Sequence, residues 1–284
     1  MNKVVYSKGM GKLSLLELIS RINYDNVGTK KSVPCYIVDD YAIIQSSILC
    51  TDYSVQNKII DTVNRLADNG VNLVRLYGYV SDESNIIDCG ATAYSSCMYV
   101  MDRAPGAELY RGVTYKYGYT SPDNVVSLLE YMDMLREIPQ EHYNKFVHDY
   151  MAILDSGVAV DPSKKGNFFY DKEKGFTFID VRNENIEPDH RFTARHIMTV
   201  VMPPALTDEL KEDANLVKYH ARGAAEILIK LDNALLANGY TREQIDSNFQ
   251  EQRFEDGSYV GPVHCSGLES VAQARDILES DTIM

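Results

Sequence analysis

The feature that most constrains the fold is a change of pattern at Pro105-Gly106. Before this pair, short apolar runs alternate with turn residues, which is typical of β-strands. After it, apolar residues recur at helical spacing. The chain has 284 residues, so a prior of roughly 150 residues per domain allows one large domain or two lobes. We therefore expect an α+β protein with a β-rich N-terminal lobe (1–102) and a helical C-terminal lobe (103–284).

The N-terminal lobe shows strand patterns around one strong helix. Residues 33–38 and 41–46 are apolar runs joined by Asp39-Asp40, a two-residue hairpin turn by composition. Residues 54–68 carry apolar side chains on one helical face. Two further strands are expected over 73–80 and 96–101. Residues 33–101 are thus predicted to form an antiparallel sheet that carries the helix.

The C-terminal lobe is mainly helical. Ser121-Pro122-Asp123 is a helix start with Pro at the first helical position, and the helix is expected to reach about Glu137. A second helix is predicted over 140–156. A strand pair follows over 167–179, and residues 206–250 return to helical spacing.

Composition narrows the classes of partner. Hydrophobic residues make up 45% of the chain and charged residues 24%, which is typical of a globular protein. The 28 basic and 41 acidic residues give a net charge of −13, which disfavours nucleic acid as a partner. No apolar run approaches the ~20 residues of a membrane span, and the N-terminus has no signal-peptide pattern. The five cysteines form no CxxC pair and suit reduced thiols. We expect a cytoplasmic protein with no nucleic-acid or membrane partner.

A polar loop and the hairpin after it contain the residues most suited to chemistry. The loop holds Asp161, Lys164, Lys165 and Asn167, and the return strand of the hairpin ends at Asp180. A hairpin brings its two ends together, so Asn167 and Asp180 are expected to converge. An amide carbonyl and a carboxylate form a hard oxygen site that suits Mg²⁺ with phosphates. The lysines would offset phosphate charge.

This order of an Asp, an Asn, a β-hairpin and a second Asp resembles the protein-kinase-like superfamily, including aminoglycoside-phosphotransferase and HipA-type kinases. The order of elements agrees over about residues 25–240. The resemblance implies a bilobal kinase-like fold with ATP and Mg²⁺ as cofactors, the metal being held by Asn167 and Asp180. It also implies that Asp161 orients or deprotonates an acceptor hydroxyl. Lys164 or Lys165 would neutralise charge on the γ-phosphate.

The resemblance extends to contacts with the nucleotide. Residues 41–45 stand where the kinase strand with Val-Ala-Ile-Lys would stand, with Gln45 in the place of the lysine. Residues 98–106 look like the hinge that binds adenine, which assigns Met101 and Arg103 to the nucleotide. Lys30 or Lys31 could reach phosphate instead of the missing strand lysine.

Several residues depart from the kinase pattern and keep other functions open. Gln45 supplies no charge, and the helix glutamate that would pair with the lysine has no counterpart, since the inward positions are Gln56 and Asn57. Asp161 and Asn167 are six positions apart, where the kinase loop has five. The favoured function is phosphoryl transfer to a hydroxyl of a protein or a small molecule. The alternatives are a pseudokinase that binds or regulates, and an interaction protein that binds no nucleotide.

Each candidate residue also has a purely structural alternative. Asn167 and Asp180 could be ordinary turn and strand-end residues, and Asp161-Pro162-Ser163 a plain turn. Lys164 and Lys165 could be a solvated loop pair, and Gln45 a solvated strand residue. The sequence does not identify the acceptor.

Overall fold

The computed structural model shows an α+β protein. It describes residues 3–25, 28–30, 33–49, 53–88, 93–109, 115–116, 119–120, 125–160, 167–179, 181–182, 193–253, 255, 257, 259–260 and 266–280. The chain forms two compact units, each considered by itself below. Unit 1 comprises the described residues within 1–106, 155–160 and 177–188, and unit 2 comprises the others.

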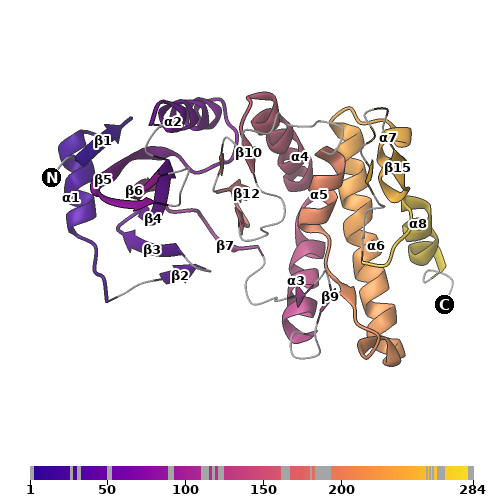
Figure 1. Ribbon diagram of the computed structural model, residues 1–284. Helices are drawn as coiled ribbons and strands as arrows, with labels where there is room; N and C mark the ends of the chain where they lie inside the picture. Colours follow the sequence, from indigo (N-terminus) through magenta and orange to yellow (C-terminus); the bar gives the residue numbers. More distant parts are fainter. Residues whose placement is uncertain are drawn as a thin grey trace. The chain divides into compact units, whose positions relative to one another are not determined.

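Unit 1 is built on a six-stranded antiparallel sheet (Figure 1). Its strands follow the order β1 (Lys3–Ser7), β5 (Leu76–Asp88), β6 (Ala93–Asp102), β4 (Tyr41–Leu49), β3 (Val33–Val38) and β2 (Gly28–Lys30). The predicted turn between β3 and β4 is confirmed. Asp39 has a φ of 54°, in the left-handed region that two-residue hairpin turns use. Its carboxylate accepts a hydrogen bond from Arg21 Nη2 at 2.9 Å, which holds the turn against the end of the first helix.

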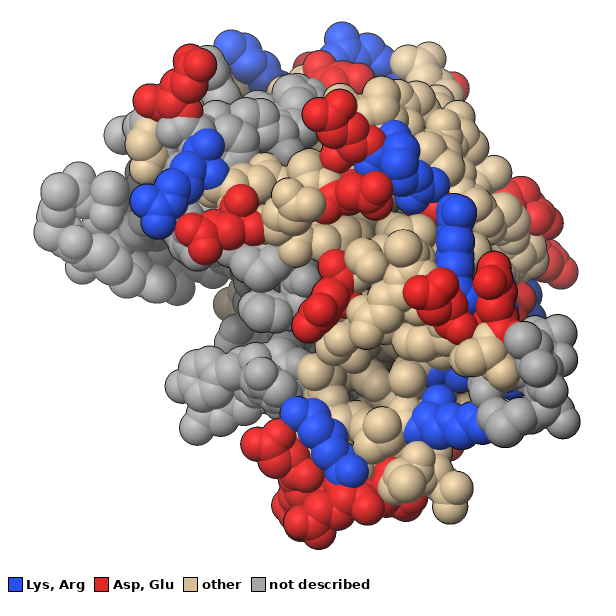
Figure 2. Space-filling view, turned by 90° about the vertical axis from the view of Figure 1, so that its right-hand side faces the viewer, with Lys and Arg blue, Asp and Glu red and all other residues tan. Residues whose placement is uncertain are grey.

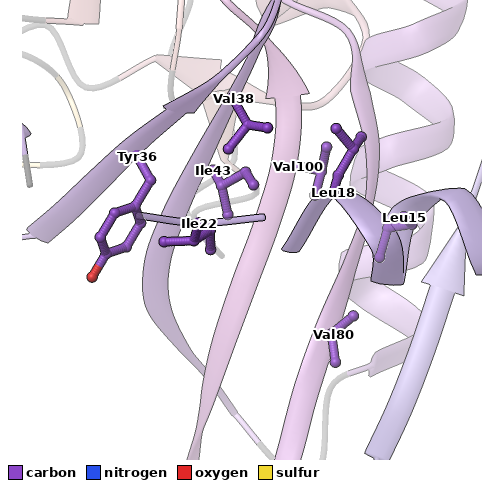
Figure 3. Packing of buried hydrophobic residues seen from close by; sticks show 8 residues of the cluster. All are labelled: Leu15, Leu18, Ile22, Tyr36, Val38, Ile43, Val80 and Val100. Atoms are coloured by element: carbon purple, nitrogen blue, oxygen red, sulfur yellow. The ribbon is translucent and has the colours of Figure 1, made fainter. Parts of the chain in front are cut away.

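Two helices cover the two faces of this sheet. The helix α1 (Lys12–Ser20) packs Leu15 and Leu18 against one face, here called the α1 face (Figure 3). The predicted helix is confirmed as α2 (Tyr53–Asp68), whose Ile60 packs on Tyr79 and Cys97 of the opposite face, the α2 face. The α1-face cluster contains Leu15, Leu18, Ile22, Tyr36, Val38, Ile43, Val80 and Val100.

Gly78 fixes how β5 divides its side chains between the two faces. Its φ is +142°, and a Cβ at this position would lie 2.1 Å from the carbonyl oxygen of Tyr6. The register of β5 against β6 shifts between Leu76 and Gly78. As a result, Leu76 and Tyr79 both pack in the cluster of the α2 face although they are three positions apart.

Two later stretches of the chain complete unit 1. The strand β10 (Ala159–Val160) pairs antiparallel with β13 (Val181–Arg182), and β13 contacts α2. The backbone N–H of Phe178 donates to the Asn72 carbonyl at 3.0 Å, and the N–H of Val74 donates to the Phe178 carbonyl at 3.1 Å. Residues 177–179 and 181–182 therefore belong to unit 1.

Unit 2 is mainly helical. The predicted helices are confirmed as α3 (Val125–Glu137) and α4 (Gln140–Asp155), and α6 (Ala214–Ala237) fills much of the expected helical stretch after residue 206. The helix α6 contacts α3 and α8. Asp213 caps its start by accepting hydrogen bonds from two backbone N–H groups. The other described elements are α5 (Thr193–Val201), α7 (Arg242–Asp246), α8 (Val271–Ser280), β7 (Ala107–Glu108), β8 (Tyr115–Lys116), β9 (Tyr119–Thr120), β14 (Ala205–Leu206), β15 (Gln252–Arg253), β16 (Tyr259–Val260), the 3₁₀ helices Leu210–Glu212 and Ser247–Phe249, and the hairpin strands given below.

Acidic and basic side chains are spread over the surface, as they are along the sequence. Figure 2 shows Asp and Glu side chains distributed over one face, with Lys and Arg between them. Among the described helices, none has both the length and the apolar composition that crossing a membrane requires.

Candidate functional site

The predicted hairpin is confirmed as β11 (Phe168–Asp171) and β12 (Gly175–Phe178). Phe168 is fully buried and lies edge-on to Phe146 of α4, with ring centroids 6.0 Å apart. The turn is held by Asp171, whose Oδ1 accepts from the backbone N–H groups of Lys174 and Glu173, each at 2.9 Å. These two hydrogen bonds lower the pKa of the Asp171 carboxyl. The start of the hairpin is therefore firmly positioned.

Asn167 directly precedes this anchored strand and is only 7% exposed. A buried amide in a fixed position can serve as a metal ligand or as a structural hydrogen-bond partner. Asp161, Lys164, Lys165 and Asp180 lie outside the described residues, so the convergence of Asn167 with Asp180 stays a prediction. Within the described residues, no three His, Cys, Asp or Glu side chains are grouped so that they could hold a metal ion.

The register of β4 decides which of its side chains faces α2. Gln45 pairs with Met98, and Met98 packs in the cluster of the α1 face. Ile44 pairs with Tyr99, and Tyr99 packs with Ile60 of α2. Because successive strand residues point to opposite faces, Gln45 lies on the α1 face and Ile44 on the α2 face.

The register separates the two residues, Ile44 and Gln45, that can be compared with the lysine of the kinase strand. Counted directly over Tyr41-Ala42-Ile43-Ile44, the motif Val-Ala-Ile-Lys places its lysine at Ile44. In kinases that lysine pairs with a glutamate of the following helix. Of Ile44 and Gln45, Ile44 is the one on the face that α2 covers. The contact of Gln45 with a nucleotide stays a prediction, and it requires the nucleotide to lie on the α1 face.

Hydrogen bonds between uncharged side chains join α2 to the sheet. The Tyr79 hydroxyl donates to Asn57 Oδ1 at 3.0 Å, and the Tyr99 hydroxyl donates to Gln56 Oε1 at 3.3 Å. These contacts confirm that Gln56 and Asn57 are the inward positions of the helix. Burial raises the pKa of Tyr79, so its hydroxyl keeps the proton that it donates. The sheet and the helix are therefore joined at this point without an ion pair.

The turn after β6 is the segment that resembles the adenine-binding hinge. Met101 is buried and the Arg103 side chain is exposed. The backbone N–H of Asp102 donates to the Arg75 carbonyl at 3.0 Å, and that of Arg103 donates to the Asp40 carbonyl at 2.8 Å. A base bound at this turn would therefore have to use other backbone groups, of which the N–H of Ala104 is the next along the chain.

Lys30 and Lys31 are the two remaining residues that the sequence predicts to contact the nucleotide. The backbone of Lys30 ends the edge strand β2, where it pairs with Val33, and its side chain is not among those described. Lys31 lies outside the described residues. A phosphate contact by either lysine stays a prediction.

The comparisons with known proteins do not assign this chain to a family. No protein-family model and no curated protein sequence matches it. Among the solved structures that do match is the amicoumacin kinase hAmiN in complex with AMP-PNP, Ca²⁺ and Ami. This chain is 12% identical to it over 96% of its own length and 94% of that chain, with a TM-score of 0.32. So low a TM-score carries no argument, and the functional proposal rests on the residues of this chain.

Proposed function

We propose that the protein is a kinase-like phosphotransferase that uses ATP and a divalent cation to phosphorylate a hydroxyl group of a protein or a small molecule. The observation that carries the proposal is the topology of unit 1. A central strand of an antiparallel sheet, β4, leads to a helix, α2, that packs back on one face of that sheet. In kinases the lysine strand and its helix follow each other in this way.

The proposed roles follow the kinase-like order of the later residues. Asn167 and Asp180 would hold Mg²⁺, which on binding would neutralise phosphate charge. The burial of Asn167 ahead of an anchored strand supports a fixed oxygen ligand. Asp161 would orient or deprotonate the acceptor hydroxyl. Lys164 or Lys165 would offset charge on the transferred phosphoryl group.

A second candidate function is nucleotide binding without transfer, as in a pseudokinase. The observation that favours it is Ile44, an apolar side chain at the strand position where the motif has its lysine. An isoleucine cannot hold the α- and β-phosphates as a lysine does.

Thermal-shift titrations with ATP and Mg²⁺, followed by ATPase and autophosphorylation assays, test both functions. Binding with turnover supports the phosphotransferase, and binding without turnover supports the second candidate. The Asp180→Ala variant should lose the Mg²⁺-dependent part of the shift. Glu173→Ala, at an exposed position of the hairpin turn, is the matched control and should keep it. If ATP shifts the melting temperature of no variant, both functions are wrong.

A further inference from the structure

A histidine and a carboxylate are in contact on α4, among residues to which the proposed function gives no role. Asp149 is 1% exposed, and its Oδ1 lies 3.2 Å from Nδ1 of His148, whose side chain is 68% exposed. Lys145 Nζ donates to the same carboxylate, at 3.0 Å to Oδ1 and 2.9 Å to Oδ2. The carboxylate is therefore held inside the protein, while most of the imidazole is open to solvent.

The contact with Asp149 decides which ring nitrogen of His148 carries the proton. A carboxylate accepts hydrogen bonds and donates none, so Nδ1–H is the donor here. In a neutral imidazole the other nitrogen, Nε2, then keeps its lone pair. Among the described residues, none is hydrogen-bonded to Nε2. Because the carboxylate also stabilises positive charge on the ring when Nε2 forms a bond, His148 is arranged as a nucleophile.

The helix surface around His148 suits an anionic reactant. Residues three and four positions apart on a helix are neighbours, and for His148 these are Asn144, Lys145, Met151 and Ala152. One of the four is a cation and none is an acid. An anion that approaches Nε2 therefore meets an ammonium group on the same helix surface.

Two other histidines of the described chain lack this arrangement. His142 has a hydroxyl, that of Tyr170, at 3.2 Å from its Nδ1 in place of a carboxylate. His220 is 3% exposed. His142 is the better internal comparison, since its ring is partly exposed and lies on the same helix as His148.

We propose that His148 is a modification site that accepts a phosphoryl group at Nε2 from a donor with a phosphorus–nitrogen bond. The lone pair of Nε2 forms the new bond to phosphorus. The phosphorus–nitrogen bond of the donor breaks, and its electron pair leaves with the protonated nitrogen as a neutral amine. The ring keeps its Nδ1 proton and becomes cationic, and Asp149 offsets that charge. The bond made and the bond broken are of the same kind, so the step needs no further reactant.

Phosphoramidate, the simplest donor of this class, tests the site. The folded protein is incubated with potassium phosphoramidate, the labelled histidines are located by mass spectrometry without acid, and phosphorus NMR distinguishes Nε2 from Nδ1 adducts. We expect His148 to be labelled at Nε2 at least about tenfold faster than His142. Asp149→Asn should slow labelling of His148 by about tenfold and leave that of His142 unchanged. Because no ATP is present, the result does not depend on the proposed phosphotransferase activity.

The contact itself is tested by unfolding. In urea the wild-type chain has no Asp149 contact at His148, so the two histidines should be labelled at equal rates. If Asp149→Asn does not fold, as judged by circular dichroism, this comparison of folded and unfolded wild type takes its place. Equal rates at His148 and His142 in the folded protein, labelling of His148 at Nδ1, or a preference that persists in urea would overturn the proposal.

Discussion

At the scale of single residues, Asp232 shows how one buried charge joins three helices. Asp232 of α6 is fully buried. Its carboxylate accepts hydrogen bonds from Arg242 of α7 at 2.5 and 2.9 Å and from Arg275 of α8 at 3.2 Å. A buried carboxylate is tolerated only when cations and hydrogen bonds compensate for its lost hydration. Asp232 therefore fastens the last two helices of the chain to the long helix of unit 2.

Replacement of Asp232 by Ala should lower the free energy of unfolding. Both arginines are partly exposed and can be rehydrated, so we expect a loss of about 1–3 kcal/mol. Urea denaturation measures it. Asp208→Ala is the control, because Asp208 pairs with Lys211 but its side chain is 99% exposed. That change should stay within about 0.5 kcal/mol, and equal losses for the two variants would contradict the role of Asp232.

His220 should make stability depend on pH. It is 3% exposed, its Nε2 lies 2.9 Å from the Pro204 carbonyl, and burial lowers its pKa below 6.5. The unfolded chain therefore binds this proton first as the pH falls. The contribution is fully present above about pH 6.5 and is lost below it, by up to about 1.4 kcal/mol per pH unit.

The variant His220→Gln isolates this contribution, since an amide can still donate to the Pro204 carbonyl. Between pH 7 and 5.5, about where histidine titrates, urea midpoints of the variant should fall less steeply than those of the wild type. Val126→Ala, at a non-ionisable side chain that is 69% exposed, should keep the wild-type slope. A His220→Gln slope equal to the wild-type one would show that His220 does not titrate on unfolding.

At the scale of elements, the docking of α2 depends on the tyrosines of the sheet. Tyr79 is fully buried and stacks on both Tyr6 and Tyr53, with ring centroids 5.9 and 6.0 Å apart. At the other end of the helix, Asn64 Nδ2 donates to the Leu76 carbonyl at 2.8 Å, and Asn64 Oδ1 accepts from the Leu76 N–H at 3.0 Å. The helix is thus held by hydrogen bonds whose geometry fixes its rotation, as well as by apolar contacts.

Tyr79→Phe should loosen α2 without removing the stacked ring. The variant leaves Asn57 Oδ1 without its donor, so we expect a loss of about 1–2 kcal/mol in unfolding free energy. Hydrogen exchange of the α2 amides should speed up with it. Tyr6→Phe is the control on the same face, because its hydrogen bond to Asp61 is exposed to solvent. Unchanged exchange in Tyr79→Phe would show that the hydroxyl does not hold the helix.

At the scale of the whole molecule, the net charge of −13 opposes the approach of a polyanion. If Lys164 or Lys165 contacts the phosphates, as proposed, added salt weakens that attraction. Metal-free ATP affinity should then fall between about 20 and 200 mM NaCl, with adenosine as the uncharged control. An ATP affinity that stays constant or rises with salt would show that no protein cation contacts the phosphates.

The sequence by itself determined the local elements. Hydrophobic period and turn residues act between near neighbours, so the hairpin turn at Asp39-Asp40, the helix α2 with its inward Gln56 and Asn57, and the hairpin after Asn167 could all be predicted. The helices α1 and α8 were not expected. The residues of the polar loop and Asp180 keep the roles that the sequence suggests as predictions.

Only the tertiary structure decided which face of the sheet each strand residue occupies. The alternation within β4 is visible in the sequence, but its direction depends on pairing with β6 and on where α1 and α2 pack. A shift of one position moves every side chain to the other face, so it is the pairing with β6 that puts Gln45 on the α1 face and Ile44 on the α2 face. Long-range packing also brought residues 177–179 and 181–182 into unit 1, and no local pattern encodes such a contact.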